Sequence, residues 1–224
     1  MRRLPRKKTR EQESSAPYYT LIIIGDNEVG KTQLLHRLNK EDFQREYFPT
    51  FGVDFRTKTN FDEKGKLLYD IQMIDFAGEK DDMHKSLINE FVDIANIFLV
   101  VFDISKEISV IKAMDIRKEY ESKITNHNIN RKWYLIGNKK DLDISDNKIP
   151  PQYRDKYDNY FEISCKNSIE EEFQKILDLI IVDLNLSNKE TKNLIKEPEK
   201  ENEPFNINFL EAHGKVFDED CIIF

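Results

Sequence analysis

Six stretches of the chain are apolar or alternate between apolar and polar residues, as β-strands do. The expected strands are Thr20–Ile24, Asp54–Phe61, Lys66–Asp75, Ile97–Asp103, Lys132–Asn138 and Tyr160–Ser164. Residues 97–102 and 133–136 are almost unbroken apolar runs, which is typical of strands covered by helices on both faces of a sheet. The tetrapeptide at residues 62–65, Asp-Glu-Lys-Gly, separates two alternating runs and predicts a hairpin turn.

Helical periodicity alternates with these strands along the chain. It is present in residues 34–38, 87–94 and 110–124, and most clearly from residue 169, where six apolar side chains share one face: Phe173, Ile176, Leu177, Ile180, Ile181 and Leu184. Strands alternating with helices predict a single α/β domain over residues 18–185. We expect a mostly parallel six-stranded sheet with helices on both faces and ligands at the carboxyl ends of its strands.

The two ends of the chain lack this pattern. Residues 1–17 are basic, polar and contain proline, which predicts a disordered arm. Residues 186–224 are rich in Asn, Lys, Glu and Pro, which predicts a flexible tail. Within that tail, the apolar residues Phe205, Ile207, Phe209 and Leu210 have two interpretations: they dock on a prenylation or carrier protein, or they fold back on the domain.

Composition narrows the class of protein. A net charge of −7 argues against nucleic-acid binding by the chain as a whole. Two cysteines, Cys165 and Cys221, are too few and too far apart for a disulfide framework. There is no apolar run long enough to span a membrane and no secretory signal, so we expect a protein of the reducing cytosol.

The first candidate site is the string GDNEVGKT at residues 25–32. It has the form G-x-x-x-x-G-K-[ST] and lies between an apolar strand and a helix start, as a phosphate-binding loop does. We therefore expect the α/β domain to be a single P-loop NTPase domain. Gly25 and Gly30 allow backbone N–H groups to surround phosphate oxygens, Lys31 reaches the β- and γ-phosphates, and the Thr32 hydroxyl can bind Mg²⁺. An accidental glycine-rich turn is the alternative, and the flanking strand and helix argue against it.

A second string, Asn138-Lys139-Lys140-Asp141, follows the apolar strand at 132–138 and points to guanine. The Asp141 carboxylate can accept hydrogen bonds from both N1–H and the exocyclic amine of guanine, a pair that adenine lacks. Asn138 can tie the base or the phosphate loop, and the Lys139 stem can lie along the ring. Residues 164–166, Ser-Cys-Lys, follow the last strand and can offer backbone N–H groups to the base oxygen.

Two further residues are candidates for Mg²⁺. Asp75 ends a strand in the string DFAGE, where its carboxylate would face a cation held by Thr32. Thr50 is placed to complete the metal shell when a γ-phosphate is bound. Asp75 could instead be a capping residue at a strand end. Phe43 and Tyr47 are either ordinary core or surface residues, or lie over the guanine edge and across the phosphates.

Taken together, GDNEVGKT, Thr50, DFAGE, NKKD and SCK resemble the Ras-like small GTPases in order and spacing over residues 20–184. The segment Phe51-Gly52-Val53-Asp54-Phe55 is similar to the effector-side strand of the Rab branch. The resemblance implies GTP or GDP and Mg²⁺ as ligands, with Thr32, Thr50 and Asp75 at the metal. It implies a nucleotide site made of Asn27, Glu28, Val29, Gly30, Lys31, Thr32, Gln33, Phe43, Tyr47, Thr50, Gly78, Asn138, Lys139, Asp141, Ser164, Cys165 and Lys166.

The resemblance also implies a switch in which residues 44–53 and 76–89 order around the γ-phosphate. Thr50 and Glu79 are the candidate catalytic residues. The family usually carries Gln where this chain has Glu79, and an ionised glutamate cannot donate a hydrogen bond and repels the γ-phosphate. At ~5 Å and an effective dielectric constant near 20, one such pair costs roughly 3 kcal/mol before Mg²⁺ and Lys31 offset it. We therefore expect slow intrinsic hydrolysis.

The last four residues, Cys221-Ile222-Ile223-Phe224, form a C-a-a-X box whose final Phe favours geranylgeranylation of Cys221. A chance cysteine in an apolar tip is the alternative. One lipid chain anchors reversibly, so stable attachment needs a second signal. The basic residues between Arg2 and Arg10 could supply it at an anionic leaflet, or form no more than a solvated arm.

We thus expect a monomeric Rab-like switch on the cytoplasmic face of a membrane, exchanging with the cytosol and acting in vesicle traffic. Its expected partners are an exchange factor, a GTPase-activating protein, effectors, and prenylation and carrier proteins. One alternative is a membrane-recruited scaffold that binds GTP but hydrolyses it poorly, because of Glu79. A second alternative is an adenine-specific P-loop enzyme.

Overall fold

The computed structural model describes residues 17–46, 52–61, 64–65, 67–76, 82–142 and 149–194, with the side chains of 82–87 and 186–194 left aside. Its core is a six-stranded sheet in the order β2-β3-β1-β4-β5-β6. The strands are β1 (Tyr18–Gly25), β2 (Val53–Phe61), β3 (Leu67–Phe76), β4 (Ile97–Asp103), β5 (Lys132–Asn138) and β6 (Asn159–Glu162). β2 pairs antiparallel with β3, and every other neighbouring pair is parallel, which confirms the predicted mostly parallel α/β sheet.

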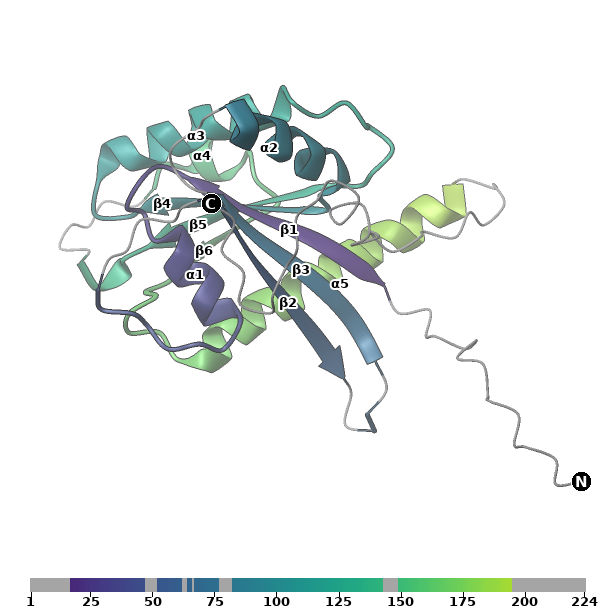
Figure 1. Ribbon diagram of the computed structural model, residues 1–224, viewed down its shortest axis with the longest axis horizontal. Helices are drawn as coiled ribbons and strands as arrows, with labels where there is room; N and C mark the ends of the chain where they lie inside the picture. Colours follow the sequence, from purple (N-terminus) through teal and green to yellow (C-terminus); the bar gives the residue numbers. More distant parts are fainter. Residues whose placement is uncertain are drawn as a thin grey trace, which may run out of the picture.

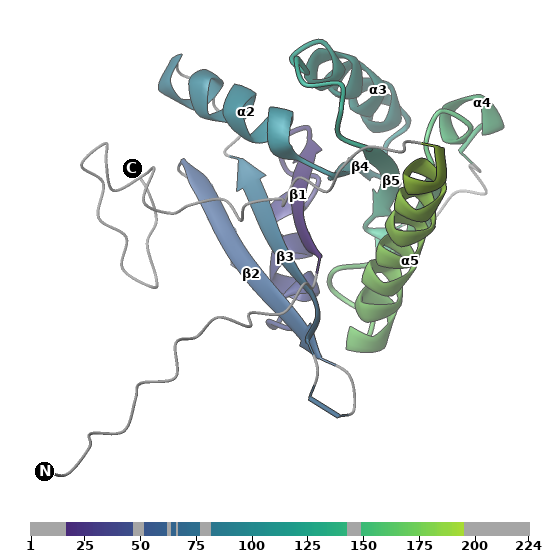
Figure 2. The same cartoon turned by 90° about the vertical axis from the view of Figure 1, so that its right-hand side faces the viewer.

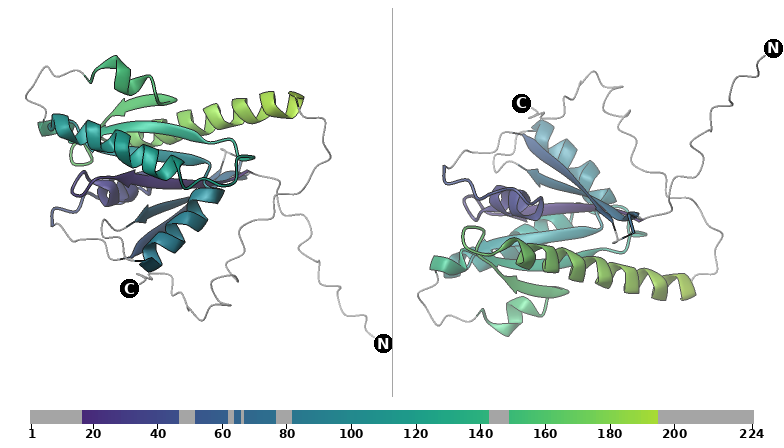
Figure 3. Two further views of the ribbon diagram at one scale, coloured as in Figure 1. Left: turned by 90° about the horizontal axis from the view of Figure 1, so that it is seen from above. Right: turned by 90° about the horizontal axis from the view of Figure 1, so that it is seen from below.

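Helices cover both faces of the sheet (Figure 1). They are α1 (Lys31–Leu38), α2 (Asp82–Ile94), α3 (Glu107–Glu121), the short α4 (Pro151–Arg154) and α5 (Glu170–Leu194). The two views of Figure 3 show α2 and α3 on one face and α1 and α5 on the other. Two separate apolar clusters correspond to these faces, one built with α1 and α5 and one with α2 and α3.

The predicted stripe of α5 forms much of the first cluster. All six of its predicted apolar side chains are buried, and Leu177 and Ile180 are fully enclosed. Burying one such side chain contributes about 1.5–3 kcal/mol, so this face of α5 fixes the helix on the sheet. Figure 2 shows α5 lying alongside the sheet, on the opposite side from α2.

Several boundaries differ from the sequence-based expectation. The apolar pattern ends near Asn185, whereas α5 continues to Leu194, because good helix formers such as Lys189 and Glu190 extend a helix without an apolar stripe. β6 ends at Glu162, since the backbone N–H of Ser164 already donates to Ser168 in the following loop. α4 and the 3₁₀ turn Lys140–Leu142 were not predicted, because elements this short have no periodicity.

The sheet places chemistry at one edge. β1, β3, β4 and β5 run in the same direction, so their carboxyl ends lie together, and the polar ends of three of them are Asp75, Asp103 and Asn138. β2 and β3 form the predicted hairpin, whose turn residue Gly65 has a φ of +74°. Among the described residues, no helix is both long enough and apolar enough to cross a membrane.

Candidate nucleotide-binding site

The loop between β1 and α1 requires glycine at both of its ends. Gly30 has a φ of +94°, and a Cβ there would lie 2.4 Å from Nδ2 of Asn138. A Cβ on Gly25 would lie 2.3 Å from the carbonyl oxygen of Val101. Both contacts are too short for any side chain, so the bare backbone is what allows the loop to pack against β4 and β5. Helix α1 begins directly after Gly30, at Lys31, so its N-terminal N–H groups face this loop.

The remaining loop residues divide by exposure. Val29 is buried, whereas Asn27 and Glu28 are exposed. Glu28 has a φ of +61°, which an ordinary side chain adopts at some cost. Its exposure meets the requirement that the acidic side chain stay out of the loop interior if a phosphate is to bind there.

Lys31 folds back over the loop. Its Nζ donates a hydrogen bond to the backbone oxygen of Asp26 over 2.9 Å. The Asp26 carboxylate pairs with Lys112 of α3, with 2.6 Å between Oδ2 and Nζ. The loop therefore has a cation over its backbone and an ion pair that ties it to α3.

Thr32 and Asp75 meet as predicted for a metal pair. The Thr32 hydroxyl donates to Oδ2 of Asp75 over 2.5 Å. Asp75 is fully buried, and its Oδ1 has no hydrogen-bond partner within the described part of the chain. Burial raises the pKa of Asp75 to about 6, although the Thr32 hydrogen bond and the charge of Lys31 lower it. An unpartnered buried carboxylate oxygen beside a hydroxyl fits a divalent cation, which would satisfy that oxygen and favour its ionised form.

Asn138 connects the phosphate loop, residues 25–32, to the loop at residues 164–168 that follows β6. Its Nδ2 donates to the carbonyl of Val29 over 2.8 Å, and its Oδ1 accepts the N–H of Cys165 over 3.1 Å. The side chain is 2% exposed, so both hydrogen bonds are made out of water. The two loops, more than a hundred residues apart in sequence, are thus held together by one amide.

Lys139 has a φ of +64°, and its Nζ lies 3.0 Å from Oδ2 of Asp103. Asp103 also accepts hydrogen bonds from the backbone and the hydroxyl of Ser105. Sequence reasoning missed Asp103 as a site residue. The available signal was its place at the carboxyl end of an otherwise apolar strand, the same place that Asp75 and Asn138 occupy.

Asp141 lies in the 3₁₀ turn after β5 and is exposed, with its Oδ1 accepting the Ser164 hydroxyl over 2.6 Å. The Cys165 side chain is buried, which raises the pKa of its thiol to about 12 and leaves it neutral. The backbone N–H groups of Ser164 and Cys165 already donate to Ser168 and Asn138, so two of the three amides predicted to face a base oxygen have protein acceptors here. Lys166 is exposed.

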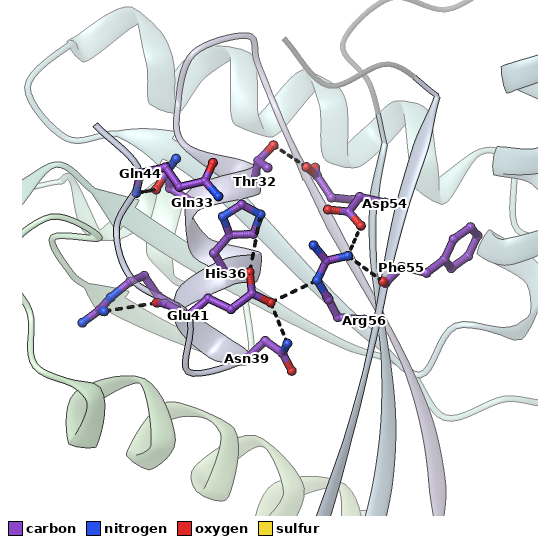
Figure 4. A network of polar contacts seen from close by, with 11 residues as sticks. Thr32, Gln33, His36, Asn39, Glu41, Gln44, Asp54, Phe55 and Arg56 are labelled. Carbon is purple, nitrogen blue, oxygen red and sulfur yellow. Dashed lines mark hydrogen bonds and ion pairs between the residues drawn. The ribbon is translucent and has the colours of Figure 1, made fainter. Parts of the chain in front are cut away.

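Phe43 is half-buried and packs against the cluster formed with α1 and α5. The segment around it is tied to α1, since Gln33 accepts a hydrogen bond from the Gln44 backbone over 3.0 Å. Figure 4 shows Glu41 between His36, Asn39 and Arg56, with which it forms hydrogen bonds and ion pairs. The predicted site residues Tyr47, Thr50, Gly78, Glu79 and Cys221 lie outside the described residues.

The structure therefore brings two groups of predicted residues to one edge of the sheet. One group consists of the loop, Lys31, Thr32 and Asp75. The other consists of Asn138, Lys139, Asp141 and Ser164. Asn138 joins the two groups directly.

Comparison with known proteins agrees with this arrangement. The profile of the Ras family matches residues 20–182. The chain is 34% identical over 170 residues to Ras-related protein Rab-32D of Dictyostelium discoideum, which covers 72% of this chain and 73% of that protein. It is 31% identical over 155 residues to human Ras-related protein Rab-7b, covering 66% of this chain and 74% of that protein. The chain belongs to the Ras family of small GTPases, in its Rab branch.

Proposed function

We propose that this chain is a guanine-nucleotide switch that binds GTP or GDP with Mg²⁺ and hydrolyses GTP. The observation that supports this most strongly is a pair of hydrogen bonds at Asn138, which donates to the carbonyl of Val29 and accepts the N–H of Cys165. These contacts join the phosphate loop to the loop at residues 164–168, which we call the base-side loop. A ligand that carries both phosphates and a purine base would occupy both loops at once. Phosphate alone or a base alone would occupy only one of them.

On the phosphate side, each residue has a role that its position supports. The N–H groups of the loop and of the α1 N-terminus hold phosphate oxygens, and Lys31 leaves the Asp26 carbonyl to neutralise the β- and γ-phosphates. Thr32 and Asp75 hold Mg²⁺, and we expect Thr50 to join them when a γ-phosphate is bound. The metal ion, when bound, neutralises charge on the phosphates during transfer.

On the base side, Asp141 selects guanine by accepting hydrogen bonds from N1–H and the exocyclic amine. The test is competition between GDP, ADP and xanthosine diphosphate for the wild-type protein and for Asp141→Asn. We expect GDP to outcompete ADP in the wild type. Asp141→Asn should lose about 100-fold in GDP affinity and gain affinity for the xanthine nucleotide, since lost hydrogen bonds to a charged group cost about 1.5–3 kcal/mol each. An unchanged ranking would support an adenine-specific or unrelated P-loop protein.

A second candidate function is favoured by one residue. Glu79 stands where the family usually has the Gln that orients the attacking water, so this chain could be a GTP-holding scaffold with little hydrolysis. Single-turnover hydrolysis of bound GTP separates the two functions. We expect Glu79→Gln to hydrolyse GTP faster than the wild type. Equal or faster hydrolysis with Glu79 would contradict a role for its charge.

We further propose that the switch works on the cytoplasmic face of a membrane, in vesicle traffic, with an exchange factor, an activating protein, effectors, and prenylation and carrier proteins as partners. Cys221 in the C-a-a-X box is the proposed geranylgeranylation site, and the basic arm at residues 2–10 the second contact. In fractionated cells we expect the wild type in the membrane fraction and Cys221→Ser mainly in the cytosolic fraction. An unchanged distribution would exclude the lipid anchor.

A further inference from the structure

Arg37 lies in the last turn of α1 and contacts two segments that are far apart in the sequence, at Glu41 and at Ser168. Its Nη2 donates to the carbonyl of Ser168 over 2.8 Å, and its Nη1 donates to the carbonyl of Glu41 over 3.3 Å. The guanidinium also lies over the ring of Phe173, 5.0 Å from its centre. Because a guanidinium is a rigid planar fork, its two ends fix the separation of the groups that they bind.

The first arm of Arg37 leads to the base-side loop. Ser168 and Ser164 are linked twice: the Ser168 N–H donates to the Ser164 carbonyl over 2.8 Å, and the Ser168 hydroxyl accepts the Ser164 N–H over 3.1 Å. The Ser164 hydroxyl in turn donates to Asp141. Arg37 therefore holds, through one backbone carbonyl, the loop that orients the carboxylate proposed to read guanine.

The second arm leads to the opposite wall of the site. The Glu41 carboxylate accepts hydrogen bonds from Asn39 over 2.7 Å and from Arg56 of β2 over 3.1 Å, as Figure 4 shows. Phe43, the proposed edge of the base pocket, follows two residues later and packs against the core. Arg37 thus contacts the segment that carries Phe43 at Glu41, the residue whose carboxylate binds Arg56 of the sheet.

We propose that Arg37 is a positioning residue that holds the two walls of the guanine pocket, the Asp141–Ser164 side and the Phe43 side, at a fixed separation. The inference rests on the proposed guanine-nucleotide function. The proposed role of Arg37 does not require contact with the base. Its effect reaches the nucleotide through the loops that it joins.

The test compares GDP with inosine diphosphate, which lacks the exocyclic amine and therefore one of the two hydrogen bonds to Asp141. Dissociation rates of both nucleotides are measured on the full chain with Mg²⁺. In Arg37→Met we expect GDP to dissociate about tenfold faster, because the two hydrogen bonds to the carbonyls of Ser168 and Glu41 are lost. The advantage of GDP over the inosine nucleotide should shrink at the same time. A general loosening of the fold would accelerate both nucleotides equally and leave that advantage unchanged.

Arg131 provides the matched control. It too joins two segments through backbone carbonyls, those of Asp93 and Asn126, on residues with no place in the proposed site. Arg131→Met should lower stability without changing the ratio of the two dissociation rates. Arg37→Lys keeps the charge but not the fork, so it should restore only part of the wild-type behaviour. Full rescue by Lys, or an unchanged ratio in Arg37→Met, would overturn the proposal.

Hydrogen exchange separates this inference from the proposed function. In Arg37→Met the backbone amides of residues 164–168 and 41–44 should exchange faster than in the wild type and in Arg131→Met, with or without nucleotide. A wild-type protein that does not bind GDP would overturn the guanine-nucleotide function itself. Unchanged exchange in both segments would overturn the role of Arg37, whatever the nucleotide results.

Discussion

Two buried carboxylates at the same edge of the sheet have opposite environments. Asp75, on the phosphate side, has Thr32 as a partner for Oδ2 and no described partner for Oδ1. Asp103, on the base side, accepts hydrogen bonds from the backbone and hydroxyl of Ser105 and from Lys139. Burial raises the pKa of Asp75 to about 6, whereas these donors outweigh burial at Asp103 and hold its pKa below the ordinary value.

The difference shows which half of the site the protein completes by itself. On the base side, Ser105 and Lys139 donate hydrogen bonds to the Asp103 carboxylate, and the Cys165 N–H donates to the Asn138 amide. The protein itself therefore preorganises that side. On the phosphate side, a buried carboxylate oxygen lacks a donor, and a divalent cation would supply what is missing. We therefore expect a ligand that brings Mg²⁺ to stabilise the phosphate side more than the base side.

Lys31→Ala should break the phosphate side and leave the base side intact. We expect the affinity for GDP to fall by about 100-fold or more, since removing one partner of a desolvated charge pair costs about 2–5 kcal/mol. The preference for GDP over xanthosine diphosphate should not change, because Asp141 and its contact with Ser164 are untouched. Equilibrium binding of fluorescent nucleotides measures both quantities.

Lys40→Ala is the control for this change. Lys40 is an exposed lysine just after α1, and it pairs with Glu170 at the surface. Its removal should leave nucleotide affinity within the error of the measurement. Wild-type affinity in Lys31→Ala would mean that the loop does not bind phosphates.

The contrast between Asp75 and Asp103 predicts opposite pH dependences of stability. Without nucleotide and Mg²⁺, unfolded Asp75 loses its proton near the ordinary pKa of 3.8, whereas folded Asp75 keeps it until about pH 6. The free energy of unfolding should therefore fall by up to about 3 kcal/mol as the pH rises between these values. Urea unfolding across this range measures the drop, which Asp75→Asn should abolish.

Asp103→Asn sharpens the same comparison. The pKa of Asp103 is lowered in the folded state, so its contribution to stability is present at neutral pH and lost as the pH falls through the folded pKa. This variant should therefore be less stable than the wild type at pH 7, whereas Asp75→Asn should be at least as stable. Destabilisation of both variants at pH 7 would show that protein groups stabilise the ionised carboxylate of Asp75, as they do that of Asp103.

The sequence predicted the strands and the site strings well because both depend on local patterns. Ile97–Asp103 and Lys132–Asn138 were predicted with the observed bounds, since an apolar run between polar residues has clear ends. The strand bounds are features that a few neighbouring residues determine. The contact between Thr32 and Asp75 joins distant residues, and it was predicted because their two strings resemble those of a known family.

The parts that could not be predicted depend on contacts between distant residues. Nothing near Arg37 in sequence indicates that its guanidinium reaches Ser168, and nothing near Asp103 indicates the approach of Lys139. The continuation of α5 to Leu194 has no apolar signal. Periodicity therefore located the elements, and the cross-links that hold the site together became visible only in three dimensions.

The smallest expected effect concerns the ion pair between Asp26 and Lys112, which ties the phosphate loop to α3. Burial raises the pKa of Asp26, but hydrogen bonds from Lys112 and the Asn27 backbone and the nearby lysine charges lower it by more. The pKa of Asp26 is therefore below its ordinary value, and the carboxylate stays ionised near the loop. Both side chains are partly exposed, and such pairs contribute about 0.2–1 kcal/mol. Lys112→Ala should therefore speed GDP dissociation by no more than about fivefold, and the effect should disappear at high ionic strength. Lys118→Ala is the control, because Lys118 lies on the same helix and pairs with Asp115 away from the loop. A large, salt-independent effect of Lys112→Ala would mean that the phosphate side is also preorganised by the protein, which would remove the difference between the two halves of the site.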